Sequence, residues 1–357
     1  MSPILSLAVS FALAAVLGFA AHRASICTVR AVSELMSART AYMLASVVKS
    51  ALWVLVVAVP VLALTGGAGP PGWALTGWAL LGGLLFGLGA GLNGACAYST
   101  MARLVDGEAG MLLTILGFAL GALLFLPLTA AGLAVPPKPA PGGLGHVVGL
   151  AAVLVPLLGL LAILELARLW RGRPRGHGIM GLVCARQYRM STAAMLIGLA
   201  GGAVLVLQGP WGYTGTLAQG AEALAGARPP PGLERWLLIG AIFAGMALST
   251  FQRGSFRPDL KPRALWLRHL AGGTAMGVGT ALAPGGNDAL VLYGMPGLSP
   301  HALPAYLGLL AGAAIGLLLV RHLLGIEMRV ACRNDLFLTE HAPRPEISAH
   351  PVGPPAR

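Results

Sequence analysis

The residues Gly82–Leu92 read GGLLFGLGAGL, and the residues Gly272–Leu282 read GGTAMGVGTAL. Five positions are identical at a constant offset of 190, namely four glycines and the final leucine. Both stretches lie in long apolar runs, and glycines spaced four residues apart let helix backbones approach closely in lipid. The two stretches therefore predict a pair of membrane helices that are related by an internal repeat. The alternative is that two glycine-rich helices resemble each other by chance.

The composition of the whole chain is that of a membrane protein. Of its 357 residues, 56% are hydrophobic and 10% are charged, and the mean hydropathy is +0.78. A soluble domain carries about 25% charged residues. These values exclude a soluble enzyme, a disordered chain and a nucleic-acid-binding domain, although the net charge is +12. We expect an all-α polytopic membrane protein with no nucleic-acid partner.

Nine apolar runs are long enough to cross the hydrocarbon core of a bilayer. They lie at 3–21, 42–64, 73–93, 110–134, 146–168, 191–207, 236–252, 268–283 and 302–325. Of the 24 basic residues, 20 fall at alternate connections and at the carboxyl-terminal end, and Lys138, Arg228 and Arg235 fall on the other side. By the positive-inside rule, the amino terminus is periplasmic and the carboxyl terminus cytoplasmic, in a bacterial inner membrane.

The offset of 190 also maps the first, second and fourth runs onto the sixth, seventh and ninth. Because the third run points inward and the eighth outward, the two halves have opposite topology, which is common in transporters. We expect an inverted repeat of four, one and four helices. The first repeat is 1–134, the connecting span with its basic loop is 135–190, and the second repeat is 191–325. The remainder, 326–357, is expected to be a cytoplasmic tail with a disordered end.

Polar and glycine-rich segments interrupt this pattern directly after the apolar runs. Three of them are 23–28, 92–100 and 283–288, and a fourth, 209–215, occupies the repeat position of the first. Irregular backbone at membrane depth is tolerated only where protein buries it or where it lines a cavity. Each segment predicts a re-entrant loop followed by a short half-helix, whose amino terminus would attract an anion. The alternative is an ordinary connecting turn.

Two cysteines stand in these interrupted segments. Cys27 and Cys96 lie beside hydroxyl side chains, whereas Cys184 lies in the basic loop and Cys332 in the tail. A lone membrane cysteine is usually a small buried hydrophobe. A thiol in such a segment would, however, suit a soft sulfur-containing ligand better than a hard oxyanion. The spacing of the four cysteines indicates neither a metal site nor a disulfide framework, so we expect no metal and no cofactor.

Asp288 needs a partner because an unpaired carboxylate within a membrane is costly. We expect it to cap the half-helix that follows it, or to pair with Arg103 or Arg23.

The interrupted segments resemble the YeeE/YedE family, whose characterised members take up thiosulfate. The resemblance rests on Arg23-x-Ser25-x-Cys27-Thr28, on 93–104, on 284–290 and on 298–302. It implies nine membrane helices with short helices in re-entrant loops, arranged as an inverted repeat. It also implies that thiosulfate passes along cysteine thiols that hydrogen-bond it in turn, without full alternating access. A small sulfur-carrier protein of the TusA type is implied as a partner at the cytoplasmic face.

The chain departs from this family at one position. The thiosulfate transporters use three cysteines on the path, and Cys27 and Cys96 match the first two. The offset of 190 places Gly286 opposite Cys96, and no cysteine lies near it. Asn287 and Asp288 would supply polar contacts instead, or this branch carries another sulfur or selenium species.

The sequence thus predicts an inner-membrane permease for a small inorganic sulfur anion, thiosulfate first, rather than an enzyme. The alternatives are a membrane sulfurtransferase or thiol oxidoreductase that uses Cys27 or Cys96, and a structural component with no flux. The energy source, the oligomeric state and the roles of Cys184 and Cys332 stay open. The residues expected to bind substrate or line its path are Cys27, Cys96, Arg23, Ser25, Thr28, Asn93, Gly94, Arg103, Gly285, Gly286, Asn287 and Asp288.

Overall fold

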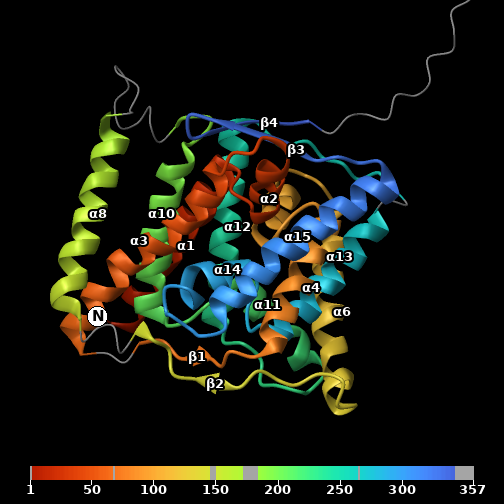
Figure 1. Ribbon diagram of the computed structural model, residues 1–357, viewed down its shortest axis with the longest axis horizontal. Coiled ribbons are helices and arrows are strands. Elements are labelled where there is room, and N and C mark those ends of the chain that lie inside the picture. Colours follow the sequence, from red (N-terminus) through yellow and green to blue (C-terminus); the bar gives the residue numbers. More distant parts are fainter. Residues whose placement is uncertain (1, 67–68, 145–149, 172–183, 264–265, 342–357) are drawn as a thin grey trace, which may run out of the picture.

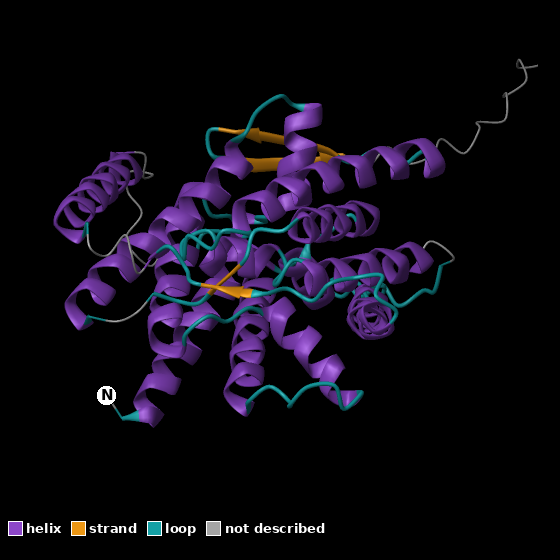
Figure 2. Cartoon of the chain, turned by 60° about the horizontal axis from the view of Figure 1, so that its bottom comes forward, coloured by secondary structure: helices purple, strands orange, loops and turns teal. Residues whose placement is uncertain are grey.

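The computed structural model describes residues 2–66, 69–144, 150–171, 184–263 and 266–341 (Figure 1). Helices make up most of these residues, and the strands are few and short (Figure 2). The nine long helices are α1 (Pro3–Ala24), α3 (Tyr42–Thr65), α4 (Gly77–Asn93), α6 (Met111–Ala130), α8 (Ala151–Arg171), α10 (Met190–Gln208), α12 (Leu233–Arg253), α13 (Leu267–Leu282) and α15 (Ala302–Leu324). Each of the nine apolar runs therefore contains one of these helices in its described part, and the chain is a multi-pass membrane protein.

Eight segments of the described chain are long and apolar enough to cross a membrane, one fewer than the sequence predicted. The exception is the run 268–283, which forms α13. Its 16 residues extend about 24 Å at a rise of about 1.5 Å per residue, less than the roughly 30 Å of a hydrocarbon core. The helix ends at Leu282, directly before the break at Ala283 and Pro284. It packs against α4 and α6, which bury its glycine-rich face.

The two glycine-rich stretches pack directly against each other where α4 meets α13. A Cβ atom built on Gly272 would lie 2.6 Å from the carbonyl oxygen of Gly89, and one built on Gly89 would meet the carbonyl of Gly272. Further along, a Cβ on Gly279 would lie 2.6 Å from the carbonyl oxygen of Gly82. Only glycine permits this close antiparallel contact, which explains why the same residues recur in both stretches.

The long helices pack in two sets. In one, α1 packs on α12 and α10, and α10 packs on α3; in the other, α4 packs on α15 and α13, and α13 packs on α6. Helix α8 packs on α3 at the edge of the molecule (Figure 1).

Short helices follow four of the long ones, where the sequence predicted half-helices. They are α2 (Thr28–Ser37), α5 (Ala97–Val105), α11 (Tyr213–Leu224) and α14 (Asn287–Ala289), and α14 continues into the π-helical turn η2 (Leu290–Gly294). Their first residues follow Cys27, Cys96, Gly212 and Gly286. In the described chain, the interrupted segments are thus helix breaks followed by a second, shorter helix.

Two small antiparallel sheets lie at opposite ends of the molecule (Figure 1). One pairs β1 (Gly72–Trp73) with β2 (Pro139–Ala140), and the other pairs β3 (Arg329–Arg333) with β4 (Leu336–His341). The second sheet is a hairpin within the expected tail 326–357, and the sequence did not predict it. The expected disorder of the tail end concerns residues that lie outside the described chain.

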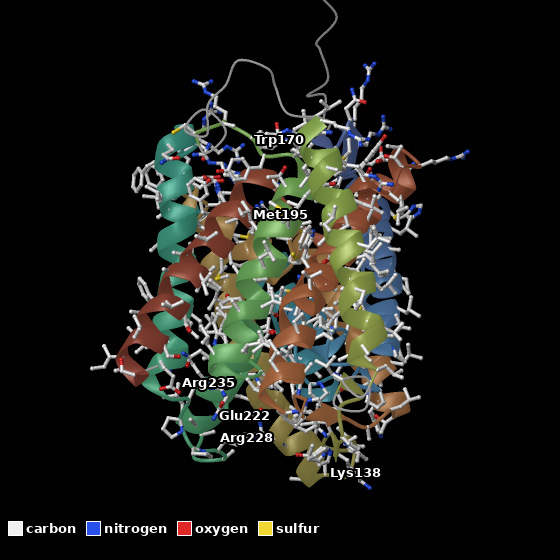
Figure 3. All side chains as sticks on the ribbon, turned by 90° about the vertical axis from the view of Figure 1, so that its left-hand side faces the viewer. Lys138, Trp170, Met195, Glu222, Arg228 and Arg235 are labelled. Carbon is white, nitrogen blue, oxygen red and sulfur yellow. The ribbon has the colours of Figure 1, made fainter. Side chains whose placement is uncertain are left out.

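Charge distinguishes the two ends. Lys138, Arg228 and Arg235 lie at the end opposite Trp170 (Figure 3), in agreement with their assignment to the side with few basic residues. We call the end that carries Trp170 and the β3–β4 hairpin the basic end.

Candidate functional site

Cys27 and Cys96 share one cavity. Each is 1% exposed and occupies the N-cap position of a short helix, Cys27 before α2 and Cys96 before α5. Both line a cavity of about 40 Å³, and their side chains interact with each other. The structure therefore brings together two thiols that are 69 positions apart in the sequence.

The same backbone device positions both thiols. Ser25 is the C-cap of α1 and Gly94 the C-cap of α4, and these two residues have left-handed φ values of 55° and 75°. In each case the cysteine comes two residues later and the next helix begins directly after it. Neither cysteine side chain makes a capping hydrogen bond, so the first N–H groups of α2 and α5 have no side-chain acceptor at the N-cap. Such groups, together with the helix dipole, favour a bound anion.

Polar groups from both halves of the chain complete this cavity. Thr28, Asn287 and Asp288 line it together with aliphatic side chains. The Oδ1 atom of Asn287 is buried and has no hydrogen-bond partner. Three of the expected path residues thus lie beside the two thiols.

Asp288 is bound to α11 and not to an arginine. Its carboxylate accepts hydrogen bonds from the Thr214 hydroxyl at 2.5 Å and from the Thr214 N–H at 3.1 Å. The expected pairing with Arg103 or Arg23 is therefore wrong. The carboxylate does cap a short helix, but this is α11, which lies 74 positions earlier, and not the α14 helix that contains Asp288.

The position expected for a third thiol is filled by other side chains. Gly286 is the N-cap of α14, as Cys96 is of α5, and its N–H donates to Thr214 Oγ1 at 2.9 Å. A Cβ atom built on Gly286 would lie 2.7 Å from Phe86 Cε2 and 2.7 Å from Thr214 Cγ2. The preceding Gly285 has a φ of 104°, which other residues rarely adopt. A cysteine at position 286 thus requires a neighbour to move.

Arg23 lies away from the thiols. It is 0% exposed, its Nε donates to Ser249 Oγ at 3.0 Å, and its terminal nitrogens donate to the Ala185 carbonyl and the Gln252 side chain. Its guanidinium also lies 4.8 Å from the ring centre of Phe19. These contacts hold the end of α1 against α12, and Arg23 is not among the residues that line the cysteine cavity.

Asn93 lies behind the Cys96 loop. Its side-chain nitrogen donates to the Ala95 carbonyl at 3.0 Å and to Thr100, while its oxygen accepts from Thr114 at 2.8 Å and meets the ring nitrogen of His269 at 2.7 Å. Asn93 therefore fixes the break after α4 to α5, α6 and α13. Its role in the structure is to hold the loop that carries Cys96.

A second cavity, of about 200 Å³, adjoins the cysteine cavity. Ser25 and Arg103 line it. Arg30 and Arg253 line it as well, and both are among the 20 basic residues that the positive-inside rule explained by topology. Three residues, Ala21, Ile26 and Tyr98, belong to the lining of both cavities. The amphipathic pattern of the short helices was the signal available in the sequence for Arg30.

A third cavity, of about 10 Å³, adjoins the cysteine cavity through Leu17 and Leu292. It is also lined by Gly209 and Trp211, which follow α10 at its end away from the basic end. The shared lining residues place the cysteine cavity between the two others. The three cavities thus form a row along the molecule.

A network of polar groups borders the large cavity. His22 Nε2 lies 3.1 Å from Asp106 Oδ1, which also accepts from Ser255 at 2.7 Å and from Thr250 at 2.9 Å. Burial raises the pKa of Asp106, but the hydrogen bonds from His22, Ser255 and Thr250 outweigh it and hold the pKa below its ordinary value. Asp106 is therefore an ionised carboxylate at neutral pH.

The other two cysteines lie outside these cavities. Cys184 is exposed, and Cys332 is buried in β3. Among the described residues, no group of three or more histidine, cysteine and acidic side chains is placed to hold a metal ion.

Comparison with the curated proteins finds no match. A protein-family model described as sulphur transport matches residues 23–315, and this range includes Cys27, Cys96 and all four short helices. Because the match covers most of the chain, the resemblance that the sequence motifs carried is confirmed, and the chain belongs to the sulphur transport family, YeeE/YedE.

Proposed function

We propose that this protein is a permease for a small inorganic sulfur anion, with thiosulfate as the first candidate. One observation carries the proposal: Cys27 and Cys96 meet in a single cavity at the starts of two short helices whose N-caps carry no capping hydrogen bond. The family match supports transport of a sulfur compound. The choice of thiosulfate and the use of both thiols are our proposals.

The chemistry of the cavity suits an anion with a soft sulfur atom. A thiol donates a weak hydrogen bond and accepts one, so each cysteine can contact sulfur without binding it irreversibly. The N–H groups at the starts of α2 and α5, with their helix dipoles, would stabilise the negative charge of the oxygen atoms. Thr28 and the unpartnered side chain of Asn287 would add polar contacts.

The path would have to widen for transport. The cysteine cavity of about 40 Å³ exceeds the roughly 10–15 Å³ that one water requires, but the third cavity, about 10 Å³, does not. We propose that Leu17 and Leu292 form the narrow part on one side of the thiols, and that Ile26 and Tyr98 form it on the other. Side-chain movement at these positions would let the anion pass from one cavity to the next without a rotation of one half against the other.

We further propose that residues 1–134 and 191–325 are inverted repeats joined by 135–190. The helix packing supports this: under the offset of 190, the pair α1–α12 corresponds to α10–α3, and the pair α4–α15 corresponds to α13–α6. The antiparallel contact between α4 and α13 would lie on the axis that relates the repeats. The basic end would face the cytoplasm of a bacterial cell, and a TusA-type carrier would collect the sulfur species there.

Growth on thiosulfate tests the proposed function. A bacterium that lacks its own sulfate and thiosulfate uptake should grow on thiosulfate when it carries this chain. Cys27→Ala and Cys96→Ala should each abolish growth, whereas Cys184→Ala, a control at an exposed position, should leave growth unchanged. Absence of growth with well-expressed wild-type protein would exclude thiosulfate and direct the test to other sulfur and selenium anions.

Mass spectrometry distinguishes the permease from a sulfurtransferase. An enzyme that forms a persulfide would carry one additional sulfur atom on Cys27 or Cys96 after exposure to thiosulfate. We expect the purified protein to retain its unmodified mass.

A further inference from the structure

The large cavity next to the thiols is lined by an excess of positive charge. Arg30, Arg103 and Arg253 line it, and the carboxylate among its lining residues is Asp106. Arg103 pairs with Glu108, to which its Nε donates at 2.9 Å, and Asp106 is engaged by His22. Arg253 donates from Nη1 to the carbonyl of His22 at 3.2 Å, and no carboxylate of the described chain forms an ion pair with it. Arg253 therefore brings to this wall a positive charge that is not paired with a carboxylate of the described chain.

Hydroxyl groups line the same cavity. Ser25 and Ser99 contribute to its wall, and Tyr98 stands where it adjoins the cysteine cavity. The Tyr98 hydroxyl is buried and has no hydrogen-bond partner. A buried polar group without a partner costs free energy unless a water or a ligand satisfies it. A ligand at the junction of the two cavities would satisfy this hydroxyl, and one with several acceptor oxygens would satisfy the arginine donors of the large cavity.

The β3–β4 hairpin forms part of the outer wall. Phe337 of β4 lines the cavity, and the guanidinium of Arg30 lies 5.3 Å from its ring centre. The hairpin is fixed by Gln187, which donates to the Phe337 carbonyl at 2.5 Å, and by Ser33, which donates to the Met328 carbonyl at 2.7 Å. Residues 326–341 lie beyond the matched part of the family, 23–315. This wall is therefore a feature of the chain that the family match does not cover.

We propose that this cavity is a second anion-binding site, separate from the thiols, that binds a tetrahedral sulfur oxyanion through Arg30, Arg103 and Arg253. Guanidinium groups bind oxyanions through paired, charge-assisted hydrogen bonds, and this chemistry needs no soft sulfur atom. The volume of this second site, about 200 Å³, is far larger than the 40 Å³ of the cysteine cavity. Phe337 holds Arg30 in place and shields the bound anion from solvent. The assignment rests on the proposed function only for the choice of a sulfur oxyanion as ligand.

Sulfate is the probe that separates this site from the thiols, because it has no sulfane sulfur. Titration calorimetry on the purified full-length protein in detergent should detect sulfate binding at low ionic strength. Arg253→Gln should weaken this binding about tenfold or more, since a charge-assisted hydrogen bond is lost. Arg253→Lys, which keeps the charge but not the fork, should bind with intermediate affinity. Phe337→Ala should weaken binding through Arg30, while the protein keeps its helical circular-dichroism spectrum.

Three controls make the result decisive. Arg321→Gln removes an arginine that lies outside this cavity and pairs with Glu327, and it should leave sulfate affinity unchanged. Cys27→Ala and Cys96→Ala should also leave it unchanged. If wild-type protein binds no sulfate, or if Arg253→Gln binds as tightly as wild type, the second site is refuted even where thiosulfate uptake succeeds. If sulfate binds as described but thiosulfate uptake fails, thiosulfate is excluded as the transported anion and the second site stands.

Discussion

The carboxylate of Asp288 and the residue Thr214 form the link between two short helices that come from different parts of the second half of the chain. The Thr214 hydroxyl donates to one carboxylate oxygen at 2.5 Å, and its N–H donates to the other at 3.1 Å. The same hydroxyl accepts from the N–H of Gly286 at 2.9 Å. Asp288 therefore caps α11 and, through Thr214, fixes the loop that faces Cys27 and Cys96.

Replacing this carboxylate should weaken the fold around the thiols. Asp288→Asn keeps the size but loses the charged acceptor, so we expect a cost of about 1–2 kcal/mol and a lower thermal midpoint in detergent. Asp259→Asn is the matched control, because this half-buried carboxylate pairs with the exposed Arg263 near the surface, and it should change the midpoint little. Combined with Thr214→Val, the effect should be less than additive. Equal midpoints for Asp288→Asn and wild type would show that the cap contributes nothing.

A cysteine at the missing position should not fit without a second change. In Gly286→Cys the new Cβ would meet the side chains of Phe86 and Thr214 at 2.7 Å, so we expect lower stability of about 1–3 kcal/mol from overpacking. Gly286→Cys combined with Thr214→Ser removes the contact with Thr214 Cγ2 but keeps the hydroxyl that binds Asp288, and it should recover part of the loss. If the single variant is as stable as wild type, the loop adjusts freely and the crowding argument is wrong.

Close helix packing should depend on glycines at specific positions. A Cβ on Gly87 would meet the carbonyl of Leu309 in α15, whereas one on Gly240 would have no atom within 4 Å. Gly87→Ala should therefore force α4 and α15 apart at a cost of about 1–3 kcal/mol, and Gly240→Ala should be neutral or slightly stabilising. The comparison of thermal midpoints measures this difference. Equal shifts would mean that glycine acts through backbone flexibility and not through contact.

Asp106 should make stability depend on pH in the acid range. Its pKa is lower in the folded protein than the ordinary value of 3.8, so ionised Asp106 stabilises the fold above that value. This contribution should be lost as the pH falls through the lower, folded pKa. Asp106→Asn should be less stable at neutral pH and should lose less stability on acidification than wild type. A profile for Asp106→Asn that runs parallel to that of wild type would contradict the assignment.

Cys184 and Cys332 should differ in their reactivity. Cys184 is exposed, whereas Cys332 is buried, and burial together with the neighbouring Glu34 carboxylate raises the pKa of the Cys332 thiol to about 12. Because the thiolate is the reactive form, a maleimide reagent should label Cys184 first and Cys332 only after unfolding. Peptide mass spectrometry after brief labelling tests this order. Labelling of Cys184 only in opened cells, and not in intact ones, would also place the basic end in the cytoplasm.

The apolar runs sufficed to place the long helices, because burial of a helix in lipid requires a continuous apolar stretch that is visible in one sequence. The polar and glycine breaks likewise located all four short helices, since a left-handed residue such as Gly94 must end a helix. The β3–β4 hairpin was missed. Its strand β3 packs on α2, and its residues Val330 and Cys332 cluster with Ala31 of α2 and Met190 of α10. These contacts join distant segments, so no local pattern in the sequence indicates them.

The site shows the same division. Sequence alone selected Cys27, Cys96, Thr28, Asn287 and Asp288, because chemistry-bearing residues in interrupted membrane segments need a cavity. It could not assign hydrogen-bond partners, because these depend on how distant segments meet. Arg23 donates to Ser249 of α12, and Asp288 accepts from Thr214. The sequence explained Arg30 and Arg253 by the positive-inside rule alone, because a count of charges does not show which cavity an arginine lines. Composition and periodicity determined that this chain lies in a membrane and where it bends, while only the packing of its helices decided which polar groups share a cavity.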